Sequence, residues 1–376
     1  MIVLFWSCLG LILYTYFGYP ALLYLSARGR PEPAAPALSP DQLPAVTVVI
    51  PAYNEQQHIA AKLRSVLESN YPADRLQVLV VVDGASDATA SIARGIDDPR
   101  LRVIEKPVRA GKPAALNDAM ALVRTPLTIL TDAAELLEHH TIRRLVRRFE
   151  DPAIGAVSGE IVMVDAQSGF SQNLGLYWRY ETFIRACEAR VGSVVGATGP
   201  LYAIRTALYR PLPPDTVLDD VAIPFEIVRQ HYRVGYARDA CASERSTPSG
   251  PQEFVRKRRT LAGNYQLISR YWQLLLPGSP IAWQFWSHKV ARLLVPYALA
   301  GLLAACLTLK RPWADVLLLL QAGFYLLATW TYLRPASKQR PWLALPYTFC
   351  LLNWAAFSGS LYYFTGRLSV RWEKVK

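Results

Sequence analysis

The apolar residues of this chain gather at its two ends, and the polar residues gather between them. Residues 2–25 form an almost uncharged run, which exceeds the roughly 20 residues that a helix needs to cross a bilayer. A cleaved signal peptide is the alternative, but the basic residues Arg28 and Arg30 follow the run instead of preceding it. We therefore predict an N-terminal transmembrane helix over residues 1–27.

Three further apolar runs near the other end predict a C-terminal membrane region, residues 287–376, with about three spans. They are Val290–Leu309, Trp313–Leu333 and Trp342–Phe364, and aromatic residues lie near several of their edges. The alternative is that these helices are buried in a large soluble core. Three spans would also put the basic tail on the side opposite the middle region, against the positive-inside rule. One run would then lie in the interface or be re-entrant. The tail residues are Arg367, Arg371, Lys374 and Lys376.

Between the apolar ends, short apolar runs alternate with amphipathic stretches. Residues 28–44 are rich in proline and predict an extended linker. From residue 45 onward the alternation predicts strands separated by helices, and therefore an α/β domain with a mostly parallel sheet covered on both faces. The predicted strands are Val46–Ile50, Leu76–Val82, Leu101–Ile104 and Leu127–Leu130, and the helices are Gln56–Leu67, Asp87–Arg94 and Pro113–Val123.

The pattern is less regular after the fourth strand, but we expect the α/β domain to cover residues 45–250. The expected elements are a helix over His139–Phe149, a strand over Ile154–Ser158 and a helix over Gln172–Arg190. Four arginines of the first helix should face water, namely Arg143, Arg144, Arg147 and Arg148. Pro251–Tyr271 is basic and amphipathic, and tryptophans follow it. Residues 251–286 are therefore predicted to be interface helices on a membrane surface.

Charge and cysteine content narrow the classes of partner. The net charge is +12, from 41 Lys+Arg against 29 Asp+Glu. The basic residues lie beside the spans and in clusters, without the interleaved aromatic residues of a nucleic-acid-binding domain, so they indicate anionic lipids and phosphate ligands and no nucleic acid. The five cysteines lack the paired spacing of a metal site and fit a reducing, cytoplasmic domain.

Polar residues directly follow the first two predicted strands. The segment Pro51-Ala-Tyr-Asn-Glu follows the first strand, where Tyr53 can face a flat base and Glu55 a ribose hydroxyl. Asp83 opens the segment Asp-Gly-Ala-Ser-Asp after the second strand. The alternative in both places is a plain turn whose polar residue caps the next helix, namely Asn54 or Asp87.

The next two strand ends predict a site for phosphates and a metal. Gly111 and Lys112 precede a helix, so an ammonium and a helix N-terminus converge on one place and can bind an anion. The glycine spacing of a P-loop is absent. The stretch Leu127–Glu135 is an apolar strand that ends at Asp132. Its carboxylate is a hard oxygen ligand suited to Mg²⁺ or Mn²⁺ bridging phosphates.

Two later segments carry further charged side chains. Asp219 and Asp220 precede a helix, either as cap and first-turn acid or with one of them as a general base for an acceptor hydroxyl. Arg256-Lys-Arg-Arg offers guanidinium groups to a diphosphate leaving group. A plain patch for lipid headgroups is the alternative.

Taken in order, these motifs resemble the membrane-bound family 2 glycosyltransferases, the group that contains cellulose, chitin, hyaluronan and poly-N-acetylglucosamine synthases. The resemblance covers the middle region and the flanking spans, and it implies a GT-A-like cytoplasmic domain in a bacterial-type inner or plasma membrane. It implies donor binding by Pro51, Tyr53, Glu55, Asp83, Lys112, Asp132, Arg256 and Arg259. It implies acceptor binding by Thr198, Gly199, Pro200 and Asp219, a catalytic base at Asp220, and a metal ligand at Asp132.

Three positions depart from the family pattern. Ala134 stands where a second acid of the metal motif is expected, and Val82 replaces an acid often found before Asp83. Thr260 replaces a tryptophan that helps to place the acceptor sugar in the processive synthases. The C-terminal spans are also few for a full polysaccharide channel.

The implied reaction is an inverting transfer from a UDP-sugar, with a divalent metal, to a growing polysaccharide or a lipid-linked glycan. Membrane lipids are expected partners, and further synthesis or export subunits are possible ones. A processive synthase with coupled export is one alternative, and Thr260 with the short membrane region favours single additions over it. A catalytically dead scaffold of an export complex is the other. The surviving Asp83, Lys112, Asp132 and Asp220 argue against a scaffold. Neither the donor sugar nor the linkage follows from the sequence.

Overall fold

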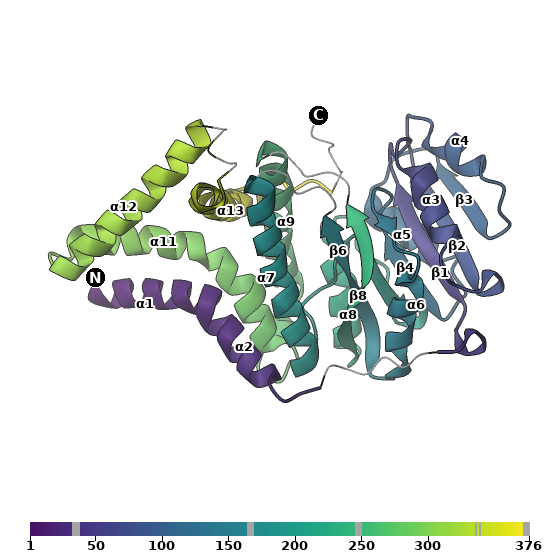
Figure 1. Ribbon diagram of the computed structural model, residues 1–376, viewed down its shortest axis with the longest axis horizontal. Coiled ribbons are helices and arrows are strands. Elements are labelled where there is room, and N and C mark those ends of the chain that lie inside the picture. Colours follow the sequence, from purple (N-terminus) through teal and green to yellow (C-terminus); the bar gives the residue numbers. More distant parts are fainter. Residues whose placement is uncertain (32–37, 164–168, 245–249, 335–336, 338–339, 371–376) are drawn as a thin grey trace.

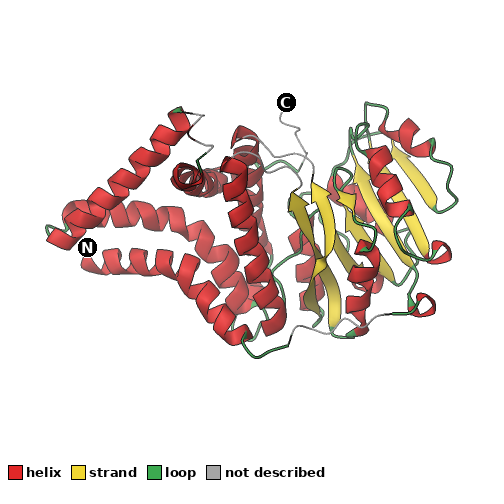
Figure 2. Ribbon diagram, viewed as in Figure 1, coloured by secondary structure: helices red, strands yellow, loops and turns green. Residues whose placement is uncertain are grey.

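The computed structural model describes residues 1–31, 38–163, 169–244, 250–334, 337 and 340–370. Strands with their covering helices form one side of the molecule, and long helices form the other (Figures 1 and 2). The predicted linker and the predicted basic tail fall partly outside the described residues, at 32–37 and 371–376.

An eight-stranded mixed sheet lies at the centre of the α/β part in the described chain, in the order β3-β2-β1-β4-β7-β6-β8-β5. Neighbours from β3 through β4 pair in parallel, as the sequence predicts. β7 pairs antiparallel with both β4 and β6, and β5 pairs antiparallel with β8. The strands are β1 (Val46–Ala52), β2 (Leu76–Asp83), β3 (Leu101–Lys106), β4 (Leu127–Thr131), β5 (Leu136–Leu137), β6 (Ile154–Met163), β7 (Leu201–Arg205) and β8 (Arg233–Glu244).

Helices cover both faces of this sheet, which explains why its central strands are apolar at successive positions. In β1, Val48 and Ile50 pack into one core with Leu63 of α3, whereas Val49 packs into the other core with Leu116 of α5. The shorter helices of this part are α3 (Ile59–Leu67), α4 (Thr89–Arg94), α5 (Lys112–Met120), α6 (Thr141–Val146) and α8 (Asp219–Arg229). The carboxyl ends of β1, β2 and β4 meet at one edge of the sheet, where open α/β folds place their ligands.

Three helices of the described chain are long and apolar enough to cross a membrane. The first, Ile2–Ala27, joins α1 (Ile2–Leu13) and α2 (Tyr19–Ala27) through a π-helical turn, η1 (Tyr14–Gly18). The second, Ala282–Thr308, joins α10 (Ala282–Gln284) and α11 (Ala291–Thr308) through another π-helical turn, η7 (Phe285–Val290). The third is α12 (Pro312–Leu333).

Helix α13 (Pro341–Phe364) is not one of these three candidates. In Figure 1, α1 and α11 run side by side across the view, whereas α13 is seen nearly along its axis, next to α9 (Gly250–Arg270) and α7 (Gly169–Val191). It packs closely on α9, since a Cβ added at Gly359 would lie 3.1 Å from the Ala262 backbone nitrogen. In its described residues the structure therefore offers two candidate spans after the α/β part, where the apolar pattern predicted about three.

One local expectation and one of the alternatives are wrong. Arg148 is buried next to Asp239 of β8, with 3.4 Å between guanidinium and carboxylate, instead of facing water. Asn54 caps no helix, because α3 begins only at Ile59. Its backbone is left-handed, with φ of 54°, and its side-chain oxygen accepts the Ser86 N–H at 2.9 Å. The Asp87 carboxylate accepts the Thr89 N–H at 3.0 Å just before α4, although the residue in the N-cap position is Ala88.

We expect Gly359→Leu to push α13 away from α9, because the nearest atoms are backbone atoms that cannot move aside. Overpacking of this kind costs about 1–3 kcal/mol, which should lower the melting temperature of the detergent-solubilised protein. Gly323→Leu in α12 is the matched control, since a Cβ there meets nothing within 4 Å. Equal melting temperatures for the two variants would show that the contact between α13 and α9 is not a tight one.

Candidate active site

The end of β4 is held in place by a buried lysine. Lys62 of α3 has no exposed surface, and its ammonium donates to the Thr131 hydroxyl and to the Glu135 carbonyl, both at 2.6 Å. Burial lowers the pKa of Lys62 to about 8, although Glu135 and Asp132 act in the opposite direction. The Thr131 hydroxyl in turn donates to the Pro200 carbonyl at 2.8 Å. These bonds fix Asp132 at the strand end and tie it to the segment that carries Thr198, Gly199 and Pro200.

Asp83 shapes the neighbouring turn. Its two carboxylate oxygens accept the backbone N–H groups of Ala110 at 2.9 Å and Gly111 at 2.6 Å. A Cβ at Gly84 would lie only 2.3 Å from the Arg109 nitrogen, so glycine is required where the two turns meet. Asp83 therefore sets the position of the loop that leads into α5.

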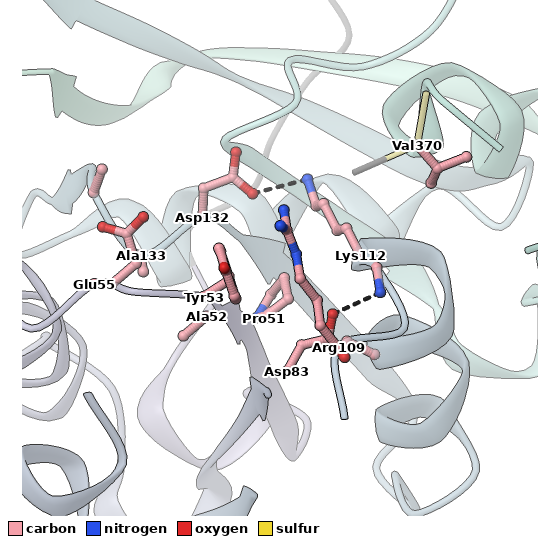
Figure 3. A pocket seen from close by; sticks show the side chains of 13 residues that line it. Pro51, Ala52, Tyr53, Glu55, Asp83, Arg109, Lys112, Asp132, Ala133 and Val370 are labelled. Carbon is pink, nitrogen blue, oxygen red and sulfur yellow. Dashed lines mark hydrogen bonds and ion pairs between the residues drawn. The ribbon is translucent and has the colours of Figure 1, made fainter. Parts of the chain in front are cut away.

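These turns enclose a pocket at the edge of the sheet, which we call the donor pocket. Figure 3 shows it with Tyr53, Arg109 and Lys112 pointing inward. The Arg109 guanidinium lies 3.7 Å from the centre of the Tyr53 ring. The donor pocket is lined by Pro51, Ala52, Tyr53, Glu55, Asp83, Arg109, Gly111, Lys112, Ala115, Asp132, Ala133, Ala134 and Val370.

Lys112 joins the donor pocket to α8. Its ammonium lies 2.8 Å from an oxygen of Asp132 (Figure 3) and 3.1 Å from an oxygen of Asp219. Burial opposes the charge of Lys112, but Asp132 and Asp219 outweigh that effect and raise its pKa above the ordinary value. The lysine is therefore a fixed positive charge between two carboxylates.

Asp220, the next residue of α8, faces a second cavity. Burial and the neighbouring Asp219 raise the pKa of Asp220 to about 6, although Lys112 and Lys289 lower it. Its backbone carbonyl accepts the Ala197 N–H at 2.8 Å, and a Cβ at Gly199 would lie 3.0 Å from its carboxylate. A carboxyl group with a pKa near neutrality and an open cavity in front of it can act as a general base.

The second cavity, which we call the acceptor cavity, has a volume of about 250 Å³ and lies between α7, α8, α9 and η7. Thr198, Gly199 and Pro200 line it, and their binding of an acceptor stays a prediction. The Thr198 hydroxyl is already engaged, since it donates to the Gly159 carbonyl at 2.8 Å and accepts from Arg185 at 2.6 Å. Thr198 therefore shapes the cavity through its own contacts with β6 and α7.

The two arginines predicted to bind the donor lie outside the donor pocket as described. Arg256 lines the acceptor cavity, and its guanidinium lies 2.8 Å from Glu253. Arg259 lies near the carboxylates of Asp219 and Asp220, and burial lowers its pKa. Neither arginine is among the described residues of the donor pocket. Their binding of the nucleotide stays a prediction.

Several lining residues could not be recognised in the sequence. Arg109 and Val370 line the donor pocket, and Arg185, Lys289 and Arg292 line the acceptor cavity. Val370 comes from the tail after α13, more than 200 residues from the other donor-pocket residues. Four of these residues are basic, and that was the only sign of them in the sequence. Basic residues are too frequent along this chain for the charge to mark a site.

The donor pocket fits a divalent ion only if the donor supplies most of the ligands. The described residues contain no group of three or more His, Cys, Asp or Glu side chains that would hold a metal. Ala134 lines the pocket and has no ligand atom, while Glu135 lines the acceptor cavity instead. Asp132 can contribute one carboxylate, and Mg²⁺ is commonly bound by one or two carboxylates with substrate phosphates and water.

A family model described as "Glycosyltransferase like family 2" matches residues 44–263. The chain belongs to this family. It is a sugar-nucleotide-dependent glycosyltransferase with a GT-A-type α/β fold.

Individual relatives match most of the chain. An N-acetylglucosaminyltransferase of Rhizobium sp. is 28% identical over 342 residues, which are 83% of this chain and 73% of that protein. A beta-monoglucosyldiacylglycerol synthase of Synechocystis sp. is 24% identical over 382 residues, 93% of this chain and 78% of the relative. The structure of mannosyltransferase PcManGT from Pyrobaculum calidifontis, in complex with GDP-Man and Mn²⁺, has a TM-score of 0.76 and 24% identity, covering 97% of this chain and 99% of that chain. At this identity the likeness establishes the fold.

We expect Gly199→Ala to lower kcat without unfolding the protein. The new methyl group would lie 3.0 Å from the Asp220 carboxylate and displace it by a few tenths of an ångström, and small displacements of reacting groups cost about 10- to 100-fold in rate. Gly192→Ala is the control, because its Cβ would meet its nearest neighbour at an ordinary 3.7 Å. Steady-state kinetics with saturating donor compare the two variants. Equal kcat values would show that the position of the Asp220 carboxylate next to Gly199 does not affect the rate.

Proposed function

We propose that this enzyme transfers a sugar from a UDP-sugar to a hydroxyl group of a glycan or lipid-linked acceptor at a membrane, with inversion at the anomeric carbon. One observation carries the proposal. Lys112 contacts Asp132 at the donor pocket and Asp219 at the start of α8, and the adjacent Asp220 lines the acceptor cavity. A leaving group bound on one side and a base on the other are what a single displacement requires.

The donor is proposed to bind where Tyr53, Glu55 and Asp83 line the pocket, with its phosphates toward Lys112 and the N-terminus of α5. The positive end of that helix and the ammonium both favour an anion. Lys112 would thereby stabilise the negative charge that develops on the leaving nucleoside diphosphate. A divalent ion, Mg²⁺ or Mn²⁺, held by Asp132 would add Lewis-acid stabilisation of the same charge.

Asp220 is proposed to remove the proton from the acceptor hydroxyl. The hydroxyl oxygen then forms a bond to the anomeric carbon as the bond from that carbon to the diphosphate oxygen breaks. The electron pair of the broken bond leaves with the nucleotide, and the proton stays on the Asp220 carboxyl group. Asp219 is held by Lys112 and by the Tyr202 hydroxyl at 3.4 Å. It is therefore proposed to position Asp220 and Lys112.

The choice of a UDP-sugar is supported by the family resemblance and by the relatives named as N-acetylglucosaminyltransferases. Single sugar additions are supported by Thr260, which lines the acceptor cavity where a processive synthase has a tryptophan. Two candidate spans after the catalytic part are also few for a polymer channel. A catalytically dead scaffold is disfavoured by the contact of Lys112 with Asp132 next to Asp220.

We propose an integral membrane protein whose catalytic part lies in the cytoplasm. Val370, after α13, lines the donor pocket, so the tail must lie on the same side of the membrane as the catalytic part. The chain would cross the membrane away from the catalytic side through Ala282–Thr308 and return to that side through Pro312–Leu333. Helix α13 would then lie in the interface, and Arg334, Arg340 and Arg367 would share the catalytic side, as the positive-inside rule favours.

Asp220→Asn tests the assignment of the base. The amide cannot accept the proton, and general-base catalysis contributes about 100- to 10,000-fold, so transfer should fall by at least the lower factor. UDP binding, followed by calorimetry in nanodiscs, should be retained because Asp220 is not part of the donor pocket. Asp74→Asn, at an exposed aspartate, is the control. Wild-type turnover in Asp220→Asn would rule out this residue as the base.

The rate should also report the pKa of Asp220. A base works only when deprotonated, so kcat/KM for the acceptor should rise with pH up to about 6, where burial and Asp219 place the pKa, and level off above it. Below that pH the rate should fall about tenfold per pH unit. A profile that stays flat down to pH 4.5 would show that no group with this pKa takes the proton.

A further inference from the structure

The acceptor cavity is more basic than transfer to a neutral hydroxyl requires. Its lining contains five cationic side chains against three carboxylates, Glu135, Glu181 and Asp220. The cationic residues are Arg185, Arg256, Lys257, Lys289 and Arg292. They come from α7, α9, η7 and α11, so four elements bring positive charge to one cavity.

Three of these cations have carboxylate partners. Arg256 and Lys257 lie 2.8 and 3.8 Å from Glu253, which is fully buried behind them. Arg292 forms an ion pair with Glu181, which also contacts His288 at 3.0 Å. Each of these three side chains therefore has a carboxylate partner within the protein, and Arg256 and Lys257 share one.

Arg185 and Lys289 are different. Arg185 donates to the neutral Thr198 hydroxyl at 2.6 Å, and within the described part of the chain it forms no ion pair. Lys289 makes neither a hydrogen bond nor a close ion pair with any described residue, although it lies near enough to Asp220 to lower the pKa of that carboxyl group. The side chains of Arg185 and Lys289 are both partly buried. Neither cation is in direct contact with a carboxylate of a described residue, and keeping such a cation partly away from water is costly. An anion from outside the chain would complete the cavity.

The backbone around Lys289 is also unusual. It lies in the π-helical turn Phe285–Val290, and such turns are rare and are frequent at functional sites. The turn places His288 against Glu188 at 2.8 Å and Glu181 at 3.0 Å, while the next residue, Lys289, lines the cavity. The His288 contacts fix the turn, and the turn fixes the ammonium.

One wall of the acceptor cavity adjoins a candidate membrane span. Lys289 lies near the start of the candidate span Ala282–Thr308. Trp272 and Trp286, close by in the chain, are about half exposed, as is typical of residues at the headgroup level. An anionic group at this depth is most simply the phosphate of a lipid.

We propose that the acceptor is a phosphate-bearing lipid whose phosphate or diphosphate is bound by Lys289 and Arg185, with its reacting hydroxyl at Asp220. This inference rests on the proposed transfer and names its acceptor class. The phosphate is not consumed: the acceptor hydroxyl loses its proton to Asp220 and gains the sugar, while the phosphate anchors the lipid. A hydroxyl nucleophile is required because an ionised phosphate oxygen would have no proton for Asp220 to remove.

The test measures transfer by the full-length enzyme in nanodiscs to four acceptors that differ in whether they carry a phosphate group and a lipid chain. A polyprenyl diphosphate-linked sugar and phosphatidylglycerol carry phosphate and a hydroxyl, diacylglycerol carries only the hydroxyl, and a soluble sugar phosphate carries both without a lipid. We expect the two phosphate-bearing lipids to be used with the highest kcat/KM. Equal or better use of diacylglycerol would overturn the phosphate site. Equal use of the soluble sugar phosphate would overturn the lipid source.

Lys289→Gln should lower the ratio of kcat/KM for phosphatidylglycerol over diacylglycerol by about 10- to 100-fold, the usual value of a charge-assisted hydrogen bond. Lys289→Arg should keep most of the ratio. A ratio within one variant does not depend on how much of that variant is folded. Lys310→Gln, at an exposed lysine just after α11, is the matched control.

An unchanged ratio in Lys289→Gln would overturn the assignment of Lys289. Nucleotide release with diacylglycerol but no phosphate preference would overturn this inference and leave the proposed transfer standing. Failure to transfer to any acceptor would overturn both. The outcomes therefore separate the acceptor class from the reaction itself.

Discussion

The contact of one ammonium with two carboxylates holds the catalytic site together. Lys112 joins Asp132, at the end of β4, to Asp219, at the start of α8. Without that charge, two carboxylates would face each other next to Asp220 with little solvent to separate them, and such pairs do not both stay ionised at ordinary pH. The position of Lys112 depends in turn on Asp83, whose oxygens hold the loop before α5. The donor side and the acceptor side are thus mechanically and electrostatically coupled.

The two cavities also differ in the elements that form them. The donor pocket is built almost wholly from the parallel half of the sheet, whereas the acceptor cavity lies between α8 and the long helices α7, α9 and η7. Those helices also contact the N-terminal helix, where the Tyr19 hydroxyl donates to Glu188 at 2.7 Å. The acceptor side is therefore part of the junction between the catalytic part and the candidate spans.

Much of the fold could be predicted because its parallel strands are continuous apolar runs that end abruptly at polar residues, as β2 does at Asp83. Asp132 was recognisable for the same reason, and Lys112 was recognisable because it follows Gly111 at the start of a helix. The two side chains meet in the structure. The rest depended on contacts between distant segments. Nothing near Arg148 in the sequence indicates its pairing with Asp239, and nothing near Val370 indicates that it reaches the donor pocket. Nothing near α13 in the sequence indicates that it packs closely on α9 either.

The anomeric configuration of the product tests the proposed single displacement most directly. With a base on one side of the anomeric carbon and the diphosphate on the other, attack must occur opposite the leaving group. An α-linked UDP-sugar should therefore give a β-linked product, read from the proton coupling constant of the anomeric position in the NMR spectrum. An α-linked product would require a second displacement or attack from the same face, and it would contradict the role given to Asp220.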